Sequence, residues 1–184
     1  MMKLKQDFWV GLAIAAIVIT SCSEQTTSQR QQPDLKRETS LRSVTLDKTK
    51  VVMGQTVYVP IYSHIYHYNN QDDVMNLSAT LSIRNTDLTN SIIITSVRYY
   101  DTDGNLIRQD IKSPVELKPL ASTNFFIAAN DTIGGSGANF IVEWVAEKTV
   151  YEPVIEAVMI STSFSQGISF VSPAKVLKQH RMQK

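Results

Sequence analysis

The glycine-rich segment Gly134-Gly135-Ser136-Gly137 is the part of the chain that comes nearest to a catalytic motif. A nucleophile elbow requires Gly-x-Ser-x-Gly between a strand and a helix, but Ala138 stands at the second glycine position and a strand-like pattern follows. A phosphate loop requires a Lys-Ser/Thr pair after its glycines, and the segment has none. We therefore interpret it as a mobile loop in which glycines permit positive φ, with a ligand-cradling loop as the alternative.

The segment Asp101-Thr102-Asp103-Gly104-Asn105 begins like a calcium loop, with oxygen-bearing side chains at its first, third and fifth positions. An EF-hand loop needs glycine at position six and glutamate at position twelve. Here the glycine is fourth and the twelfth residue is Lys112. The Asp-Gly pair between two apolar runs is typical of a hairpin turn instead.

The three histidines do not form a recognisable catalytic or metal-binding set. His64 and His67 are three residues apart near a predicted strand end, and so they point to opposite faces. A loop-borne metal site with Asp72, Asp73 and Met75 is the alternative. Because no acid–base pair is visible either, the sequence favours a protein that is not an enzyme and that has no cofactor and no metal.

Composition limits the classes of protein further. The chain has 184 residues, 43% of them hydrophobic, which suits one ordinary domain. The formal net charge is +1, which argues against nucleic acid as a partner. A single cysteine excludes an intramolecular disulfide and any multi-thiolate metal site.

The N-terminus is typical of an exported lipoprotein. Lys3 and Lys5 precede an apolar run, Phe8 to Ile19, that is too short to span a bilayer. Ile19-Thr20-Ser21-Cys22 then resembles the bacterial lipobox. This pattern predicts a signal peptide over residues 1–21 and a lipid-modified Cys22 that anchors the protein in a membrane. An ordinary secreted protein cut by another peptidase is the alternative.

The predicted location is the periplasmic or extracellular face of the cell envelope. Ser23 follows the cysteine, where the inner-membrane retention signal of some lipoproteins has Asp, so it favours the outer membrane. Cleavage before Cys22 would remove Lys3, Lys5 and Asp7 and leave no net charge.

Three further parts are predicted after the signal peptide. Residues 22–43 have few aliphatic and no aromatic side chains, which is typical of a flexible tether. Residues 44–177 form the folded domain, and residues 178–184 form a basic tail in which His180 is solvated. The tail could touch an anionic lipid or polymer, although a frayed terminus is the simpler interpretation.

Short runs of β-type residues fill the folded domain. Leu77 to Ile83 alternates between apolar and polar residues, which is typical of a sheet with one face on a core. In the run from Phe140 to Ala146, Trp144 is in phase with Phe140 and Val142, which predicts that it lies in the core. Seven or eight such runs with frequent turn signals predict an all-β fold, an antiparallel immunoglobulin-like β-sandwich.

A row of tyrosines is the candidate partner-binding surface. From Val57 to Ile65 the aliphatic residues fall on one face, which leaves Tyr58, Tyr62, His64 and Tyr66 on the other. Pro60 among them suggests an edge strand or a bulge. Tyrosine suits interfaces because its ring gives a large contact area at low entropic cost. The alternative is that loops or a second sheet cover these rings.

Four segments together resemble an uncharacterised family of small bacterial lipoproteins with a domain of unknown function. They are Val57–Tyr66, Leu81–Asp87, Val97–Asp101 and Gly134–Phe140. The resemblance implies an exported, membrane-anchored domain and no particular activity. Our leading hypothesis is a non-catalytic module that binds an unknown protein or envelope polymer. An envelope enzyme or metal-handling protein, and a structural subunit of an envelope assembly, are the alternatives.

Overall fold

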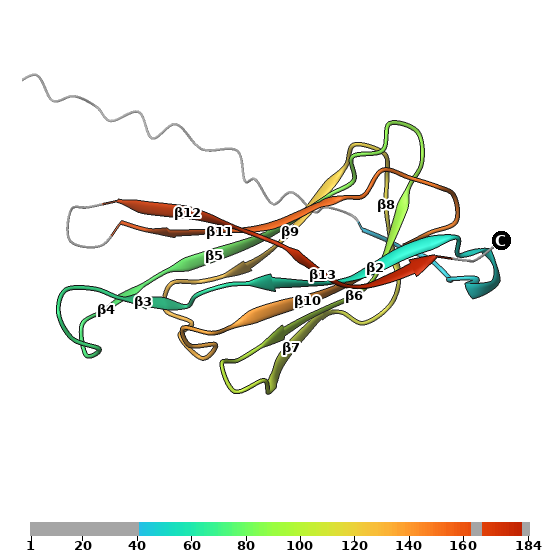
Figure 1. Ribbon diagram of the computed structural model, residues 1–184. Coiled ribbons are helices and arrows are strands. Elements are labelled where there is room, and N and C mark those ends of the chain that lie inside the picture. The colour runs from blue at the N-terminus through green and yellow to red at the C-terminus, as the bar shows by residue number, and fades with distance from the viewer. Residues whose placement is uncertain (1–40, 163–166, 182–184) are drawn as a thin grey trace, which may run out of the picture. The chain divides into compact units, whose positions relative to one another are not determined.

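The computed structural model describes residues 41–162 and 167–181, which belong to one compact unit. In them the chain forms antiparallel β-sheets and one 3₁₀ turn, η1 (Lys48–Lys50), as Figure 1 shows. The prediction of an all-β antiparallel fold is therefore confirmed. The predicted signal peptide, Cys22 and most of the predicted tether lie outside the described residues. No helix in the described ranges is long and apolar enough to cross a bilayer.

The larger sheet has seven strands. Its order is β1-β8-β6-β10-β2-β13, and β7 also pairs with β6. The bounds are β1 (Arg42–Ser43), β2 (Met53–Pro60), β6 (Ile92–Tyr100), β7 (Leu106–Ile111), β8 (Val115–Leu117), β10 (Asn139–Ala146) and β13 (Lys175–Arg181).

A four-stranded sheet and a hairpin complete the fold. The smaller sheet has the order β12-β11-β5-β9, and β3 pairs with β4. The bounds are β3 (His64–Tyr66), β4 (Val74–Asn76), β5 (Ser78–Arg84), β9 (Ser122–Ile127), β11 (Val154–Ser161) and β12 (Ile168–Pro173).

The two large sheets share one hydrophobic core. Alternation along β10 turns Phe140, Val142 and Trp144 inward, and all three are fully buried. Leu81 and Ile83 meet them from β5 of the smaller sheet. Burial of each such side chain contributes roughly 1.5–3 kcal/mol. The predicted burial of Trp144 is thus confirmed.

β6 contains a β-bulge at Thr95 where it pairs with β10, and it pairs with two different strands on its other side. Ser96 opposes Glu143 and Ile94 opposes Trp144, so Thr95 is the extra residue on β6. Its hydroxyl donates to the Glu143 carbonyl. On the other side, β6 pairs first with β8 and then with β7. β8 in turn recruits β1, which extends the sheet at this end.

The predicted domain boundaries are corrected at both ends. Arg42 and Ser43, assigned to the tether, already pair with β8. Four of the seven residues assigned to a basic tail belong to β13, which pairs with β2. The tail prediction was wrong because a charged edge strand looks like a solvated terminus in sequence.

The prediction that Pro60 marks an edge strand or a bulge was also wrong, because the β2–β10 register runs through Pro60 without a shift. β2 lies inside the sheet, between β10 and β13. Pro60 is its last residue, and β13 pairs with β2 only as far as Tyr58. The missing N–H of the proline therefore removes no bond from the β13 ladder.

Candidate functional site

The Asp101 segment forms the predicted hairpin turn between β6 and β7. The Asp101 carboxylate accepts hydrogen bonds from the backbone of Asp103 and from both the backbone and the side chain of Asn105. These bonds, those of Asn105 foremost, hold the pKa of Asp101 below its usual value. Its oxygens are thus committed to the turn.

The Gly134–Gly137 loop is fastened to this turn. The Gly134 carbonyl accepts from both the backbone and the hydroxyl of Thr102, at 2.9 Å each. The amide of Gly137 donates to the Thr102 hydroxyl, and the Gly135 amide donates to Thr132. Gly135 has φ +74°, as the sequence suggested. Two amides that a ligand cradle could offer are therefore already used inside the protein.

The four residues of the predicted tyrosine surface do not form one row. Tyr58 lies on the outer face of the larger sheet, in β2. Tyr62 follows that strand and packs edge-on against Phe170 of β12, with ring centroids 5.9 Å apart. His64 and Tyr66 contact each other on β3. The fold divides the set because β2 ends at Pro60 and the chain then turns into the β3–β4 hairpin.

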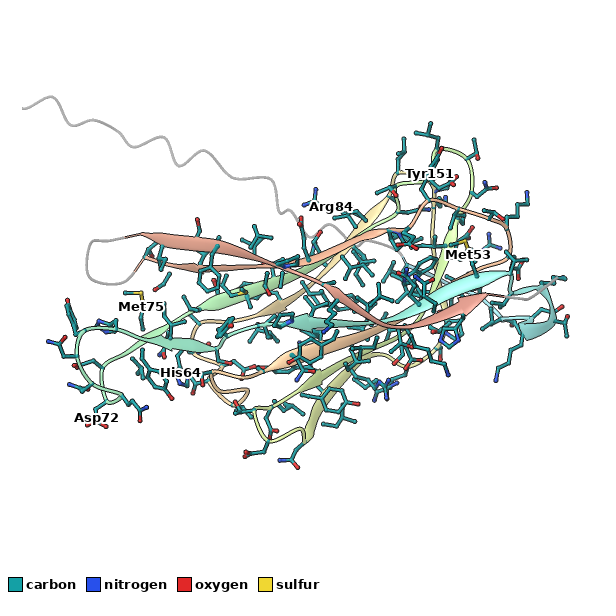
Figure 2. All side chains as sticks on the ribbon, viewed as in Figure 1. Met53, His64, Asp72, Met75, Arg84 and Tyr151 are labelled. Carbon is teal, nitrogen blue, oxygen red and sulfur yellow. The ribbon has the colours of Figure 1, made fainter. Side chains whose placement is uncertain are left out.

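The loop-borne metal site gains no ligand cluster within the described ranges. Figure 2 shows His64, Asp72 and Met75 at the hairpin end of the molecule. The Asp72 amide donates to Asn70 Oδ1, and the ring centroids of His67 and Tyr68 lie 4.3 Å apart. Among the residues that the structure describes, no three or more of His, Cys, Asp and Glu gather in a way that could hold a metal ion.

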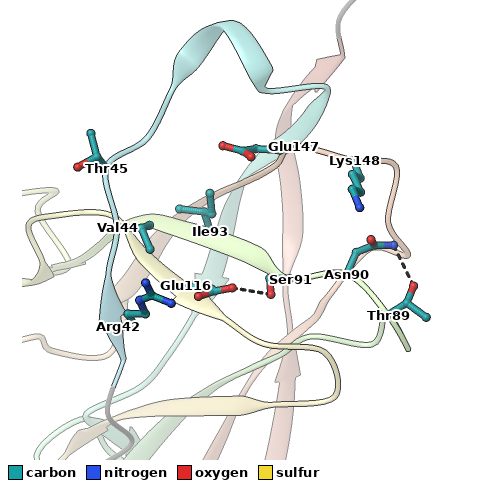
Figure 3. Close-up of a pocket in the computed structure, with 10 residues that line it drawn as sticks. All are labelled: Arg42, Val44, Thr45, Thr89, Asn90, Ser91, Ile93, Glu116, Glu147 and Lys148. Carbon is teal, nitrogen blue, oxygen red and sulfur yellow. Dashed lines mark hydrogen bonds between the residues drawn. The ribbon is translucent and has the colours of Figure 1, made fainter.

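A pocket of about 480 Å³ lies at the β1 end of the larger sheet, and Figure 3 shows its lining. The strand register explains which side chains form the floor of the pocket. Arg42 opposes Glu116, and Glu116 opposes Ile93, so the three side chains lie in one row on the outer face. The Ser91 hydroxyl donates to Glu116 at 2.8 Å. The lining is completed on one side by Val44 and Thr45, and on the other by Thr89, Asn90, Glu147 and Lys148.

One wall of the pocket is fixed by a buried polar pair, Asn85 and Asp87. Asp87 Oδ1 accepts from the backbone amides of Thr89 and Asn90, both pocket residues, at 2.9 and 2.7 Å. Its Oδ2 accepts from the Tyr151 amide at 3.2 Å. The bonds from Thr89 and Asn90, in that order, lower the Asp87 pKa to about 2.

Asn85 ties the same wall to a second loop. Its side-chain amide donates to the carbonyls of Asn90, Leu117 and Lys118, and its Oδ1 accepts from the Asp87 amide. Sequence reasoning missed this pair as a functional element. The available signal was Asn85-Thr86-Asp87 directly after a clean strand, a pattern that favours side-chain bonds to backbone.

Mixed charge is the chemical character of this pocket. Arg42, Glu147 and Lys148 form no ion pair with any other residue that the structure describes, while hydroxyl and amide groups lie between them. Such a lining can bind a polar or zwitterionic group. It sits beside Leu41 and Arg42, where the described chain begins.

Comparison with known proteins identifies one family. A family model described as a protein of unknown function (DUF3124) matches residues 54–177, most of the described unit. Neither a curated protein nor a solved structure matches the chain.

Proposed function

The chain belongs to the DUF3124 family of proteins of unknown function, and from this premise we propose that it is a membrane-anchored envelope lipoprotein with a non-catalytic binding domain. Lipid on Cys22 holds the protein in the membrane, on the periplasmic or extracellular side, with Ser23 favouring the outer membrane. The domain is an immunoglobulin-like β-sandwich. Residues 23–40 join its first strand to the anchor.

The pocket at the β1 end is the observation that carries the binding function. Its wall is held by side chain to backbone bonds from Asn85 and Asp87, which are 2% and 5% exposed. A wall fixed in this way loses little freedom when a ligand binds, and the affinity gains accordingly. Loops on a rigid β scaffold are common binding sites for the same reason.

The test is quantitative capture of partners from crosslinked membranes. Thr45→Trp fills the pocket, and Lys148→Glu replaces one basic residue of its lining by an acidic one. Both residues are exposed, so the melting temperature should stay within about 2 °C of the wild type. Lys112→Glu changes an exposed lysine after β7 and serves as the matched control.

We expect both pocket variants to lose at least ten times more of the same captured partner than the Lys112→Glu control. If all three variants capture that partner as well as the wild type, the pocket is not its binding site. If Lys112→Glu alone loses it, the site lies near β7.

A structural subunit is the second candidate, and the outer face of the smaller sheet supports it. Val171, Val158, Thr80 and Phe126 oppose one another in register across all four strands. Val171 and Phe126 are 54% and 57% exposed. Among the described residues, the one ion pair on this face is Arg84–Glu156. The pair has no net charge, so the face as a whole does not repel a second copy of itself. Light scattering of the wild type and Phe126→Ser would show a dimer that the variant loses.

A further inference from the structure

The edge strand β13 places two lysines and a histidine on the outer face of the larger sheet. Lys175 opposes Tyr58, Lys178 opposes Thr56, and His180 opposes Gly54. In a regular strand, residues three apart point to opposite faces. The register shift between Val176 and Lys178 changes this phase, so both lysines share the face that bears Tyr58.

These lysines are not neutralised locally. Lys175 and Lys178 are exposed and form no ion pair with another described residue. Their register partners, Tyr58 and Thr56, are two residues apart, so the two lysine Cα atoms lie about 7 Å apart along the strand. β13 is also the last strand of its sheet, so a ligand can approach it from the open side.

An aromatic and polar row continues from the cations across the sheet. Tyr58 opposes Ile141, and Ile141 opposes Arg98. Arg98 bonds to Glu143 and lies 6.0 Å from the centre of the Tyr100 ring. All five side chains are half-buried. The result is a platform with the half-buried ring of Tyr58, one balanced ion pair and an excess of positive charge at its β13 edge.

We propose that this surface, the β13 platform, binds a carboxylated glycan chain. The ring of Tyr58 stacks against the C–H face of a sugar, as aromatic rings stack against other flat apolar surfaces. Lys175 and Lys178 pair with carboxylates of the chain through charge-assisted hydrogen bonds. Arg98 and Glu143 offer a donor and an acceptor to the sugar hydroxyls.

Charge alone would also fit an acidic polypeptide or an anionic bilayer. The platform favours a glycan because its centre combines a half-buried ring with hydrogen-bonding side chains, which a saccharide uses together. The β13 edge of the platform is the opposite edge of the sheet from β1, where the pocket lies. The two sites can therefore be tested separately.

The experiment measures binding of the full, detergent-solubilised protein to polygalacturonate, a polymer of carboxylated sugars, in about 0.1 M salt, where the Debye length is about 10 Å. Dextran, polyglutamate and phosphatidylglycerol vesicles are the comparison ligands. The variants are Tyr58→Ala and the pair Lys175→Gln with Lys178→Gln. Lys112→Gln, an exposed lysine after β7, is the matched control.

We expect polygalacturonate to bind at least tenfold more tightly than dextran and polyglutamate. Tyr58→Ala should weaken it about five- to tenfold, the double lysine variant should weaken it more, and Lys112→Gln should change it less than twofold. Equal binding of polyglutamate, with no effect of Tyr58→Ala, would reduce the platform to a simple cationic patch. Preference for the vesicles would identify it as a bilayer contact. Either result overturns the glycan proposal, and so does the absence of polygalacturonate binding. None of these outcomes affects the interpretation of the capture experiment on the pocket.

Discussion

The indole N–H of Trp144 donates a 3.2 Å hydrogen bond to Oε1 of Gln55, its direct register partner on the neighbouring strand. The Trp144 side chain is fully buried and Gln55 is 3% exposed. The bond satisfies the one polar atom of the largest side chain in the core. Gln55 Nε2, in contrast, is buried without a hydrogen-bond partner among the described residues.

We expect Gln55→Leu to lower the free energy of unfolding by about 1–2 kcal/mol. The substitution leaves the indole N–H unpaired in the core, which destabilises the fold. It also removes the buried, unpartnered Nε2, but the stabilisation from that removal is smaller. Chemical denaturation of both proteins measures the difference. In a Trp144→Phe background, which has no indole N–H, Gln55→Leu should lower the free energy of unfolding by at least about 1 kcal/mol less than it does in the wild type. A coupling of zero would show that the bond contributes nothing to stability.

The Asp87 carboxylate should make stability depend on pH in the acid range. Its folded pKa is about 2, below the ordinary 3.8, so the unfolded chain takes up the proton first as the pH falls. The stabilisation is therefore complete above about pH 4 and is lost as the pH falls through 2.

Unfolding curves between pH 5 and pH 2 test this expectation. Asp87→Asn should be less stable than the wild type at pH 5, and the gap should close toward pH 2. Asp101→Asn is the control, because Asp101 is another carboxylate with a lowered pKa and lies at the β6–β7 turn. A constant gap across this range would mean that the charge of Asp87 is irrelevant to the wall of the pocket.

Gly134→Ala should be more damaging than Gly104→Ala, although Gly104 is the one of these two glycines that has a positive φ. A Cβ at Gly134 would lie 2.0 Å from Tyr99 Oη and 2.8 Å from Ala138 Cβ, both in the core. Such overpacking costs about 1–3 kcal/mol. A Cβ at Gly104 meets nothing within 4 Å. The alanine there is destabilised only by its left-handed backbone conformation, by about 1 kcal/mol. Thermal unfolding of the two variants ranks them, and the reverse order would place the Gly134 loop away from Tyr99.

Cys22→Ser should release the protein from membranes. The proposed anchor is the lipid on this residue, and several acyl chains bind far more firmly than the single chain that gives marginal attachment. Detergent partitioning of the wild type and the variant measures the effect. Mass analysis of the N-terminal peptide gives the independent readout. An unmodified Cys22 in protein extracted from membranes would contradict the lipid anchor.

Alternation in the sequence determined the fold class and much of the core. Leu77, Ala79, Leu81 and Ile83 alternate with polar residues, and Phe140, Val142 and Trp144 keep the same period of two. This period is a local property that survives in any antiparallel sheet. The Asp-Gly turn at Gly104 was equally readable, because turn chemistry depends on neighbours in the chain.

Tertiary structure alone decided which strands are neighbours, and with them the candidate sites. Arg42, Glu116 and Ile93 come from three distant segments, and they meet because β8 pairs with β1 on one side and with β6 on the other. Lys175 and Lys178 share a face through a register shift that no spacing rule contains. Strand pairing depends on long-range packing and loop closure, so a single sequence gives no local signal for it.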